Sequence, residues 1–402
     1  MSRLIIFCKN GVETLSYFSA QMAQAFASRD YEIFWLDLNM TGLGAWKLRQ
    51  MVPGKEAVLV TFNCIGLSGE EGLWELDDAG MACSSIWEQL GIRCLNILAD
   101  HPMYYYKPLR RPVPGMRVYC IDRDHAAYMK RFYPQIPCGF LPLAGNCLPG
   151  EALVPGQAES LEQWIKRPYP VVFTANYVPL ANIEKQLRSL EPEYRDFYFE
   201  IIHALVRHPG QDLFSCIETY LRREMPDITD EGMCSAMSTM PAVDLWVRTH
   251  FREKTVRALA EGGITVHVFG KDWEQMPCSH PQHIISCGRM IDSAGCARAM
   301  AQGKIALNTM PWFKDGAHDR IFTAMLQQAV PLTDASTYLQ ENFRDMDPVV
   351  YYDLEKLEEL PQKAGQLLQE PEQMHALASQ GKSLAQQHHL WACRADMLEA
   401  DF

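Results

Sequence analysis

The sequence lacks long hydrophobic runs, and it lacks the short motifs of several large enzyme classes. No apolar stretch approaches the roughly 20 residues that span a bilayer. The first apolar run, 4–8, is too short for the core of a signal peptide, so we expect a protein that stays in the cytoplasm. The sequence also lacks four motifs that mark large enzyme classes: a Walker loop, Gly-x-Gly-x-x-Gly after a strand, Gly-x-Ser-x-Gly and His-Glu-x-x-His. Their absence argues against those enzyme classes.

Cysteine is present, but not in a spacing that binds metal. The chain contains 13 cysteines and no Cys-x-x-Cys pattern. Zinc ribbons and thioredoxin-like redox sites need such spacing, so neither is expected. Cysteines in apolar surroundings, such as Cys94, Cys120 and Cys216, are typical of reduced core residues. They indicate a reducing compartment, and we expect no chemistry from them.

The chain has fewer basic than acidic residues, 37 against 49, which gives a formal net charge of −12 at pH 7. Such a chain repels nucleic-acid phosphates and anionic lipid headgroups, so we expect neither as a partner. The loop that contains Lys107, Arg110 and Arg111 is a basic exception. It is either a solvated surface loop or a contact for a phosphate or an acceptor.

Short apolar runs alternate with amphipathic stretches over 402 residues, of which 48% are hydrophobic and 21% charged. This composition is typical of a soluble globular protein, and the length suits two α/β domains. In the first half we predict strands at 4–8, 31–36, 57–62, 94–98 and 118–121, with helices at 15–27 and about 81–90. Strands that alternate with helices form mostly parallel sheets, in which ligands bind beyond the carboxyl ends of the strands.

Residues 144–168 are rich in glycine, proline and polar residues and lack periodicity. We therefore predict a first domain at 1–148, a linker at 149–168 and a second domain at 169–385. The second domain has strands at 169–174, 264–269, 304–307 and 330–332, each of the last three followed by a helix, and a mainly helical segment at about 178–261. A last helix, at about 388–400 within the segment 386–402, is expected to pack back on the first domain.

The segment 304–334 is the richest in polar and ionisable groups. A buried strand ends at Leu307, a polar loop follows, and a helix with one apolar face begins near Asp319. The free N–H groups and the dipole at the start of a helix favour an anion, and Arg320 can add a two-donor contact to a phosphate. Alternatively, Asp319 only caps the helix, while His318 and Arg320 form surface pairs.

Polar residues follow two other predicted strands of the second domain. The ligand-binding candidates there are Thr174, Asn176, Tyr177, Gly270, Lys271, Asp272 and Trp273. Glycine lets the backbone approach a ligand, Lys271 supplies a charge and Trp273 supplies a flat ring. The alternative at 270–273 is a glycine turn with a packed tryptophan.

In the first domain, Asp100 and His101 follow the strand at 94–98. Either side chain has a pKa range suited to taking a proton from a hydroxyl group. Alternatively, Asp100 and Pro102 shape a turn and His101 is structural.

The stretch from Asp315 through Thr323 to Asp334 resembles the Glu-x7-Glu region of GT-B glycosyltransferases. It is most similar to the group-1-like branch that includes bacterial spore-maturation-type glycosyltransferases. The similarity continues in order along nearly the whole chain, in the segments 61–66, 99–105, 120–125, 140–145, 172–177 and 266–273. Three positions depart from the family pattern: Asp315 and Thr323 replace the two glutamates, and Gln328 replaces a glycine.

The resemblance implies an α/β fold of the GT-B type, with two Rossmann-like domains facing a cleft and a helical insertion early in the second. It implies transfer of a sugar from a nucleoside-diphosphate donor to a hydroxyl acceptor, which is a glycan, a protein or a small molecule. The donor is expected to lie against Asn308, Asp315, Gly316, His318, Asp319, Arg320, Thr323, Thr333 and Asp334. Asp334 is a candidate to replace the second glutamate at the ribose.

No metal or other cofactor is expected. Two Asp-x-Asp patterns match the manganese motif of metal-dependent transferases, but Asp122 is expected to cap a helix at 125–132, and Asp345 with Asp347 lies in a turn. The charge of the leaving diphosphate is then held by Arg320, by Lys271 and by helix N-termini, which makes Arg320 catalytic together with Asp100 and His101. Two other functions stay open: a sugar-nucleotide epimerase on the same fold, and a non-catalytic protein that binds sugar nucleotides or glycans.

Overall fold

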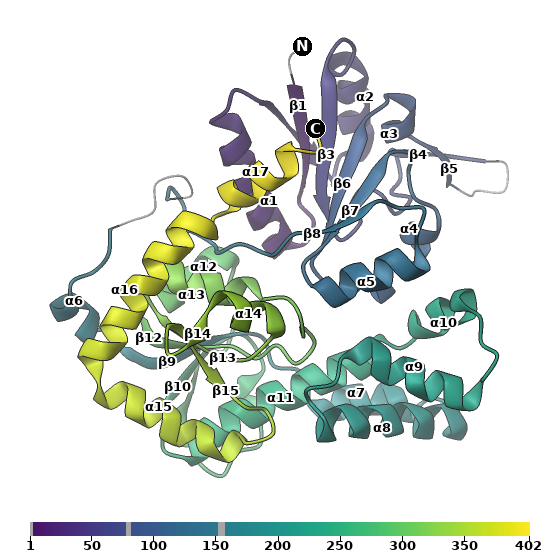
Figure 1. The fold of residues 1–402 in the computed structure, drawn as a ribbon. Helices are drawn as coiled ribbons and strands as arrows, with labels where there is room; N and C mark the ends of the chain where they lie inside the picture. The colour runs from purple at the N-terminus through teal and green to yellow at the C-terminus, as the bar shows by residue number, and fades with distance from the viewer. Residues whose placement is uncertain (1–2, 78–81, 152–156) are drawn as a thin grey trace. The chain divides into compact units, whose positions relative to one another are not determined.

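The computed structural model describes residues 3–77, 82–151 and 157–402. The chain forms two compact units, one made of Met1–Leu143 with Trp391–Phe402 and the other of Ala144–Leu390. Each unit is built around one large sheet of parallel strands (Figure 1). None of the described helices is long and apolar enough to cross a membrane.

The sheet of the first unit has six strands in the order β2-β1-β3-β6-β7-β8, and all neighbours are parallel. The strands are β1 (Arg3–Lys9), β2 (Glu32–Asp37), β3 (Glu56–Phe62), β6 (Arg93–Leu98), β7 (Met116–Cys120) and β8 (Cys138–Phe140). The helices are α1 (Glu13–Ala27), α2 (Thr41–Met51), α3 (Ile86–Gln89), η1 (Pro102–Tyr105), α4 (Tyr106–Arg110), α5 (Arg123–Phe132) and α17 (Trp391–Glu399). A separate antiparallel ribbon joins β4 (Trp74–Leu76) and β5 (Ala82–Ser85).

The core of the first unit is built by apolar strands and by the end of the chain. The strand β1 is buried from Leu4 to Cys8, as expected for a parallel strand covered on both faces. The ring centroids of Trp391 on α17 and Phe18 on α1 lie 4.7 Å apart. The Nε of Arg394 donates to the carbonyl oxygen of Pro142 over 2.7 Å.

The sheet of the second unit has seven strands in the order β11-β10-β9-β12-β13-β15-β14. The strands are β9 (Tyr169–Thr174), β10 (Val266–Phe269), β11 (Ile284–Ser286), β12 (Gly303–Leu307), β13 (Val330–Asp334), β14 (Arg344–Asp345) and β15 (Pro348–Tyr352). The α-helices outside the segment between β9 and β10 are α6 (Leu161–Ile165), α12 (Ser293–Met300), α13 (Asp319–Leu326), α14 (Thr337–Asn342), α15 (Leu360–Gln369) and α16 (Pro371–His388). Three 3₁₀ helices are η2 (Trp273–Gln275), η3 (Pro281–His283) and η4 (Leu357–Glu359).

A helical segment interrupts this unit between β9 and β10. Its helices are α7 (Leu180–Arg188), α8 (Pro192–Arg207), α9 (Leu213–Glu224), α10 (Asp230–Met237) and α11 (Pro241–Glu261). The buried residues of α11 lie all around the helix and include the polar residues Asp244, Thr249 and Glu253. Other parts of the unit therefore enclose α11, and several of its polar side chains need partners inside the protein.

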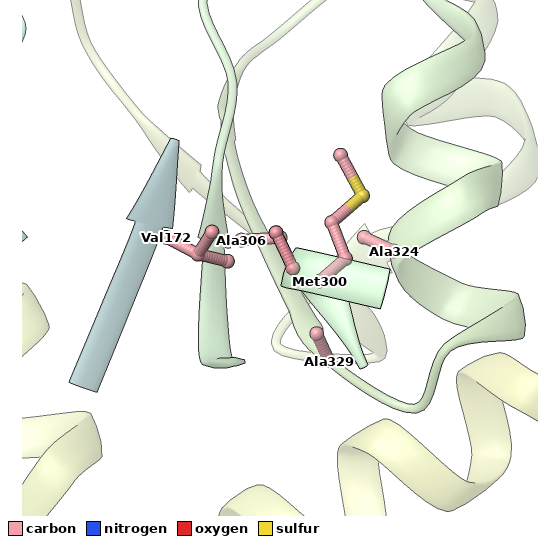
Figure 2. Packing of buried hydrophobic residues seen from close by; sticks show 6 residues of the cluster. Val172, Met300, Ala306, Ala324 and Ala329 are labelled. Atoms are coloured by element: carbon pink, nitrogen blue, oxygen red, sulfur yellow. The ribbon is translucent and has the colours of Figure 1, made fainter. Parts of the chain in front are cut away.

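Small residues bring two helices close to the sheet of the second unit. One buried cluster joins Val172 on β9, Met300 on α12, Ala306 on β12 and Ala324 on α13 (Figure 2). Gly303 makes the same close approach, since a Cβ there would lie 2.4 Å from Cγ1 of Val172. These contacts fix the position of α13 against β9 and β12.

Most strand predictions are confirmed. Those made for the first half correspond to β1, β2, β3, β6 and β7, and those made for the second half correspond to β9, β10, β12 and β13. The helical segment expected at about 178–261 is confirmed as well.

The structure differs from the predictions at several elements. The helix expected at about 81–90 is β5 followed by the short α3, because the Ser85 hydroxyl accepts from the N–H of Glu88 and starts the helix there; Met81 lies outside the described residues. The helix expected at about 388–400 is confirmed as α17, but it begins three residues later, at Trp391, where the carbonyl of His389 accepts from Gly145 N–H. The strand β10 is followed by η2, η3 and β11 before the next α-helix, and β8 follows the last strand expected in the first unit.

Candidate active site

The carboxyl ends of β9 and β12 mark the most favourable place for a ligand in the second unit. From β9 the sheet continues to β10 and β11 on one side, whereas β12, β13 and β15 follow on the other side. Parallel strands at such a reversal leave a crevice at their carboxyl ends. Thr174 ends β9, and Asn308 follows β12 directly. Both candidates therefore belong to this switch point.

The helix α13 begins at the same edge. His318 is its N-cap and Asp319 its first residue, so the predicted start is confirmed while the cap is His318. The guanidinium carbon of Arg320 lies 5.7 Å from the ring centroid of Phe173, the penultimate residue of β9. This contact puts Arg320 beside the end of β9.

The imidazole of His318 is neutral and lies against the Arg320 side chain. Burial, followed by the charge of Arg320, lowers the pKa of His318 to about 4. Its Nε2 lies 3.0 Å from a terminal nitrogen of Arg320. Its Nδ1 accepts from the backbone N–H of Arg320 over 3.2 Å, as the N-cap of α13, and lies 2.7 Å from Oδ1 of Asp319.

Asp319 lies beside this histidine as a buried carboxylate. Burial alone would raise its pKa, but His318, Arg320 and Asn146 together lower it. The Nδ2 of Asn146 donates to Oδ2 of Asp319 over 2.8 Å. Asp319, His318 and Arg320 thus lie in contact and present one guanidinium.

Two arginines of α11 join Arg320, and neither was singled out from the sequence. The guanidinium carbons of Arg248 and Arg252 lie 4.7 and 5.3 Å from the ring centroid of Trp312. Burial, followed by the charges of Arg320 and Arg248, lowers the pKa of Arg252 well below its usual value. The three guanidiniums are therefore close enough to repel one another. Asp244 pairs with Arg248.

This arginine cluster, Arg248, Arg252 and Arg320, contains unsatisfied donors. Within the described part of the chain, Nε of Arg252 and Nη1 of Arg320 are buried without a hydrogen-bond partner. Buried donors without acceptors are costly, and so is repulsion between buried charges of one sign. A bound anion would supply both the acceptors and the missing negative charge.

The loop after β12 is held against the end of β13. The N–H of Met310 donates to Oδ1 of Asp334 over 2.7 Å, and Nδ2 of Asn308 donates to the Thr333 hydroxyl over 2.9 Å. Burial raises the pKa of Asp334 to about 6. Counting described residues only, Oδ1 of Asn308 and Oγ1 of Thr174 are buried without a hydrogen-bond partner.

Other residues of the same segment have internal contacts. The carbonyl oxygen of Gly316 accepts from the Ser336 hydroxyl over 2.6 Å, and Asp315 beside it is half-buried. The hydroxyl of Thr323 donates to the carbonyl oxygen of Asp319 over 2.8 Å and accepts from Asn146 N–H over 2.9 Å. Thr323 therefore fastens α13 to the segment that enters the second unit.

A polar pocket of about 920 Å³ lies beyond the carboxyl ends of β13 and β15. Asp334 and Lys314 contribute to its wall, and the Lys314 ammonium group donates to the carbonyl oxygen of Pro209. A second pocket, of about 550 Å³, lies beside β10 and α12 and is lined by Arg289 and Asp292 among others. Space for a ligand therefore exists on both sides of the switch point.

The turn after β10 is locked onto the segment after β9. A Cβ on Gly270 would lie 2.0 Å from the carbonyl oxygen of Ala175, so only glycine fits. The N–H of Lys271 donates to Oδ1 of Asn176 over 3.0 Å, and Nε1 of Trp273 donates to the carbonyl oxygen of Ala175 over 2.6 Å. The structure brings these candidates together through hydrogen bonds between side chains and backbone.

The ring of Trp273 is enclosed by the core. It is 1% exposed and packs against Phe173 and Tyr177, which corresponds to the alternative of a glycine turn with a packed tryptophan. The hydroxyl of Tyr177 donates to Glu253 on α11 over 2.7 Å. Lys271 is exposed, with its ammonium group 3.8 Å from the carboxylate of the adjacent Asp272.

In the first unit, His101 is buried at the start of η1. Its Nδ1 accepts from the N–H of Met103 over 3.1 Å. The rings of His125 and Tyr128 lie edge-on to it, with centroids 4.6 and 4.8 Å away. These contacts fit a structural role.

Asp100 differs from its neighbour, because it is only half-buried. Its carboxylate accepts from Nδ2 of Asn63 over 3.2 Å and from the hydroxyl of Tyr105 over 3.3 Å. Asn63 also accepts from the N–H of Ala99 over 2.8 Å, which fixes the end of β6. The carboxylate is thus positioned by its neighbours and not enclosed.

The acidic patterns considered as metal motifs have other roles. Asp122 caps α5, where its carboxylate accepts from the N–H of Asp124 over 2.8 Å. Asp345 accepts from the N–H of Tyr351 over 2.8 Å. Across the described ranges, no group of three or more His, Cys, Asp or Glu side chains could hold a metal ion.

Comparison with known proteins gives one family match and several structures of similar fold. Residues 248–400 match a family described as glycosyl transferase-like. No curated protein matches the sequence. The structure of an α-glucosyltransferase in complex with UDP is similar with a TM-score of 0.55 and 9% identity, over 100% of this chain and 99% of that chain. HepE of Anabaena, in complex with UDP and glucose, has a TM-score of 0.51 and 10% identity, over 99% of this chain and 98% of that chain.

A further α-glucosyltransferase structure contains UDP and a 13-mer DNA with an HMU base, at a TM-score of 0.55 and 10% identity, over 100% of this chain and 99% of that chain. At such low identity these structures establish the fold, and they confirm the expected GT-B architecture with two Rossmann-like domains. The matched stretch begins at Arg248 within α11 and ends just after α17, so the three arginines of the cluster lie in it. The chain therefore has the GT-B fold, and its C-terminal part matches the glycosyl transferase-like family.

Proposed function

We propose that the chain transfers a sugar from a nucleoside diphosphate to a hydroxyl acceptor without a metal ion, and that the arginine cluster holds the diphosphate. The observation that supports this most strongly is the convergence of Arg248, Arg252 and Arg320 at the switch point, where Nε of Arg252 and Nη1 of Arg320 have no acceptor among the described residues. A diphosphate has the charge and the oxygen atoms that these guanidiniums need. The start of α13 adds N–H groups and a favourable helix dipole.

The proposed reaction forms one bond and breaks one. The acceptor oxygen attacks the anomeric carbon, the bond from that carbon to the phosphate oxygen breaks, and the nucleoside diphosphate leaves. Negative charge grows on the leaving oxygen, where fixed guanidiniums stabilise the transition state more than the ground state. Because His318 is neutral, it accepts a hydrogen bond from the backbone N–H of Arg320 and adds no competing positive charge.

We propose Asp100 rather than His101 as the base that takes the acceptor's proton. His101 uses Nδ1 to accept a backbone N–H and is enclosed by two aromatic rings. The Asp100 carboxylate is half-buried and held by Asn63 and Tyr105. A carboxylate fixed in this way can accept a proton from a hydroxyl group.

Uridine is the nucleoside we propose to test first, because the similar α-glucosyltransferase and HepE structures contain UDP. We propose a glycan, protein or small-molecule acceptor and not DNA, since a net charge of −12 repels a polyphosphate. All 13 cysteines are free thiols, which supports a cytoplasmic location. The sequence segments shared with the spore-maturation-type branch support that branch within the fold.

A thermal-shift screen of UDP-, GDP-, dTDP- and CMP-sugars tests the donor. A ligand at 100 times its dissociation constant adds about 2.7 kcal/mol of stability, a shift that is easily measured. An NMR time course with the selected donor then tests the reaction. Appearance of a glycosylated acceptor supports the transferase, whereas conversion of the donor without any acceptor would show an epimerase instead.

A further inference from the structure

We propose that Cys120 and Cys138 form an oxidation-sensitive pair, which a hydroperoxide converts into an intramolecular disulfide. The two sulfur atoms lie 3.9 Å apart. Neither thiol is in a disulfide in this structure. The pair lies in the first unit and does not depend on the proposed donor site.

The sheet places the two cysteines on neighbouring strands. In the parallel pairing of β7 and β8, Val118 is opposite Cys138 and Cys120 is opposite Phe140. The cysteines are therefore diagonal neighbours, and their sulfur contact shows that they share one face of the sheet. A disulfide bond is about 2.05 Å long, so the sulfurs must approach by roughly 2 Å. The strand β8 is the edge of the sheet, pairs with β7 alone and contains three half-buried residues, which makes it the strand of the two that can shift.

The two thiols differ in access. Cys120 is fully buried, whereas Cys138 is half-buried and can be reached from solvent. An oxidant therefore meets Cys138 first, and Cys120 lies behind it as the second thiol. This arrangement of an accessible cysteine next to a resolving one is typical of redox-sensitive sites.

The surroundings of the two thiols also shift their pKa values in opposite directions. The hydrogen bond from Cys120, followed by the charges of Lys130 and Arg117, lowers the pKa of Cys138 although burial opposes this. Burial raises the pKa of Cys120. Cys138 is thus the more acidic of the two thiols, and the thiolate is the form that attacks an oxidant readily.

The reaction balances in two steps. The Cys138 thiolate attacks one oxygen of the hydroperoxide, the O–O bond breaks, and the leaving oxygen takes a proton, which leaves a sulfenic acid on Cys138. The Cys120 sulfur then attacks the Cys138 sulfur, the S–S bond forms, the S–O bond breaks, and water leaves with the Cys120 proton. A small thiol such as glutathione reverses the change by thiol–disulfide exchange.

Peptide mass spectrometry of the reduced full-length chain, treated with hydrogen peroxide, tests the pair. We expect one cross-linked peptide that contains Cys120 and Cys138 and that disappears on reduction. In Cys120→Ser the sulfenic acid on Cys138 persists and reacts with dimedone, whereas in Cys138→Ser the buried Cys120 stays reduced. Before oxidation, iodoacetamide should modify Cys138 about tenfold or more faster than Cys120.

Cys83→Ser is the matched control, because Cys83 is exposed and lies outside the pair. It should leave the cross-link unchanged. Circular dichroism and melting temperature of each variant confirm that it is folded. The proposal is wrong if peroxide oxidises Cys83 completely while Cys120 and Cys138 are both still recovered as free thiols.

Discussion

The fold buries the carboxyl group of Asp334 at the end of β13. It is 3% exposed, and burial raises its pKa to about 6, against the opposing influence of Lys314 and Arg320. An unfolded chain ionises the same group at a pKa of about 3.9. Between these values the folded protein binds more protons than the unfolded one. The unfolding free energy therefore falls as the pH rises from about 4 to about 6, and the loss persists above that.

The variant Asp334→Asn should remove this loss. Its amide oxygen can still accept from Met310 N–H, but the side chain carries no charge. Relative to the wild type, the variant should gain on the order of 2 kcal/mol of stability between pH 4 and pH 7. Urea denaturation at a series of pH values measures this difference. A difference in unfolding free energy between the variant and the wild type that does not change with pH would show that Asp334 ionises normally.

The helix α13 ends in a left-handed residue that is not glycine. Gln328 has a φ of 54°, a conformation that costs a non-glycine residue roughly 1 kcal/mol. Its side chain offsets this cost: Oε1 accepts from Glu159 N–H over 2.7 Å, and Nε2 donates to the Glu159 carbonyl and the Ser379 hydroxyl over 3.1 Å each. The departure from the family glycine thus ties α13 to the segment before β9 and to α16.

Two substitutions separate the strain from the hydrogen bonds. Gln328→Ala keeps the strained backbone and loses the bonds, so it should destabilise the fold by about 3 kcal/mol. Gln328→Gly loses the same bonds but relieves the strain, so it should be about 1 kcal/mol more stable than Gln328→Ala. Chemical denaturation measures both, with the exposed Gln186→Ala as a control. Equal stability of Gln328→Ala and the wild type would mean that the side-chain bonds contribute nothing.

The elements that sequence predicts best are those whose signal is local. The buried runs of β1, β3 and β9 need only their own residues to be recognised, and Asp122 caps α5 by bonding two residues ahead. Short edge strands such as β8 bury too little to give a pattern, and all three of its residues are half-buried. Sequence patterns therefore predict the central strands of each sheet, and they miss a short edge strand such as β8.

In the candidate site, too, only the part with a local sequence signal could be predicted. The start of α13 could be predicted, because a strand, a polar loop and an amphipathic helix follow one another in the sequence. Arg248 and Arg252 could not, since they reach Arg320 only through the packing of α11, about seventy residues earlier in the chain. The buried residues of α11 lie on all sides of the helix, so no single apolar face in its sequence marks the two arginines. For Trp273 the sequence left a ligand contact and a packed ring open, and the ring is packed in the core.

The proposed metal independence is a property of the whole molecule and rests on the arginine cluster. If guanidiniums neutralise the leaving diphosphate, transfer should continue after dialysis against EDTA, with turnover within about twofold of the untreated enzyme. Addition of manganese or magnesium should then change little. If EDTA abolished transfer and manganese restored it, a metal ion and not the arginine cluster would neutralise the leaving diphosphate.

The proposed donor site is tested most directly by the turnover of Arg320→Ala with the nucleotide sugar that the screen identifies. Because the guanidinium acts mainly on the departing diphosphate, turnover should fall on the order of 10²–10³, or about 3 kcal/mol, while donor affinity changes less. Arg320→Lys should recover only part of the rate, since it lacks the planar pair of donors. Arg222→Ala, a surface arginine paired with Glu218 on α9, serves as the matched control. A folded Arg320→Ala enzyme with wild-type turnover would contradict the placement of the donor phosphates at the arginine cluster.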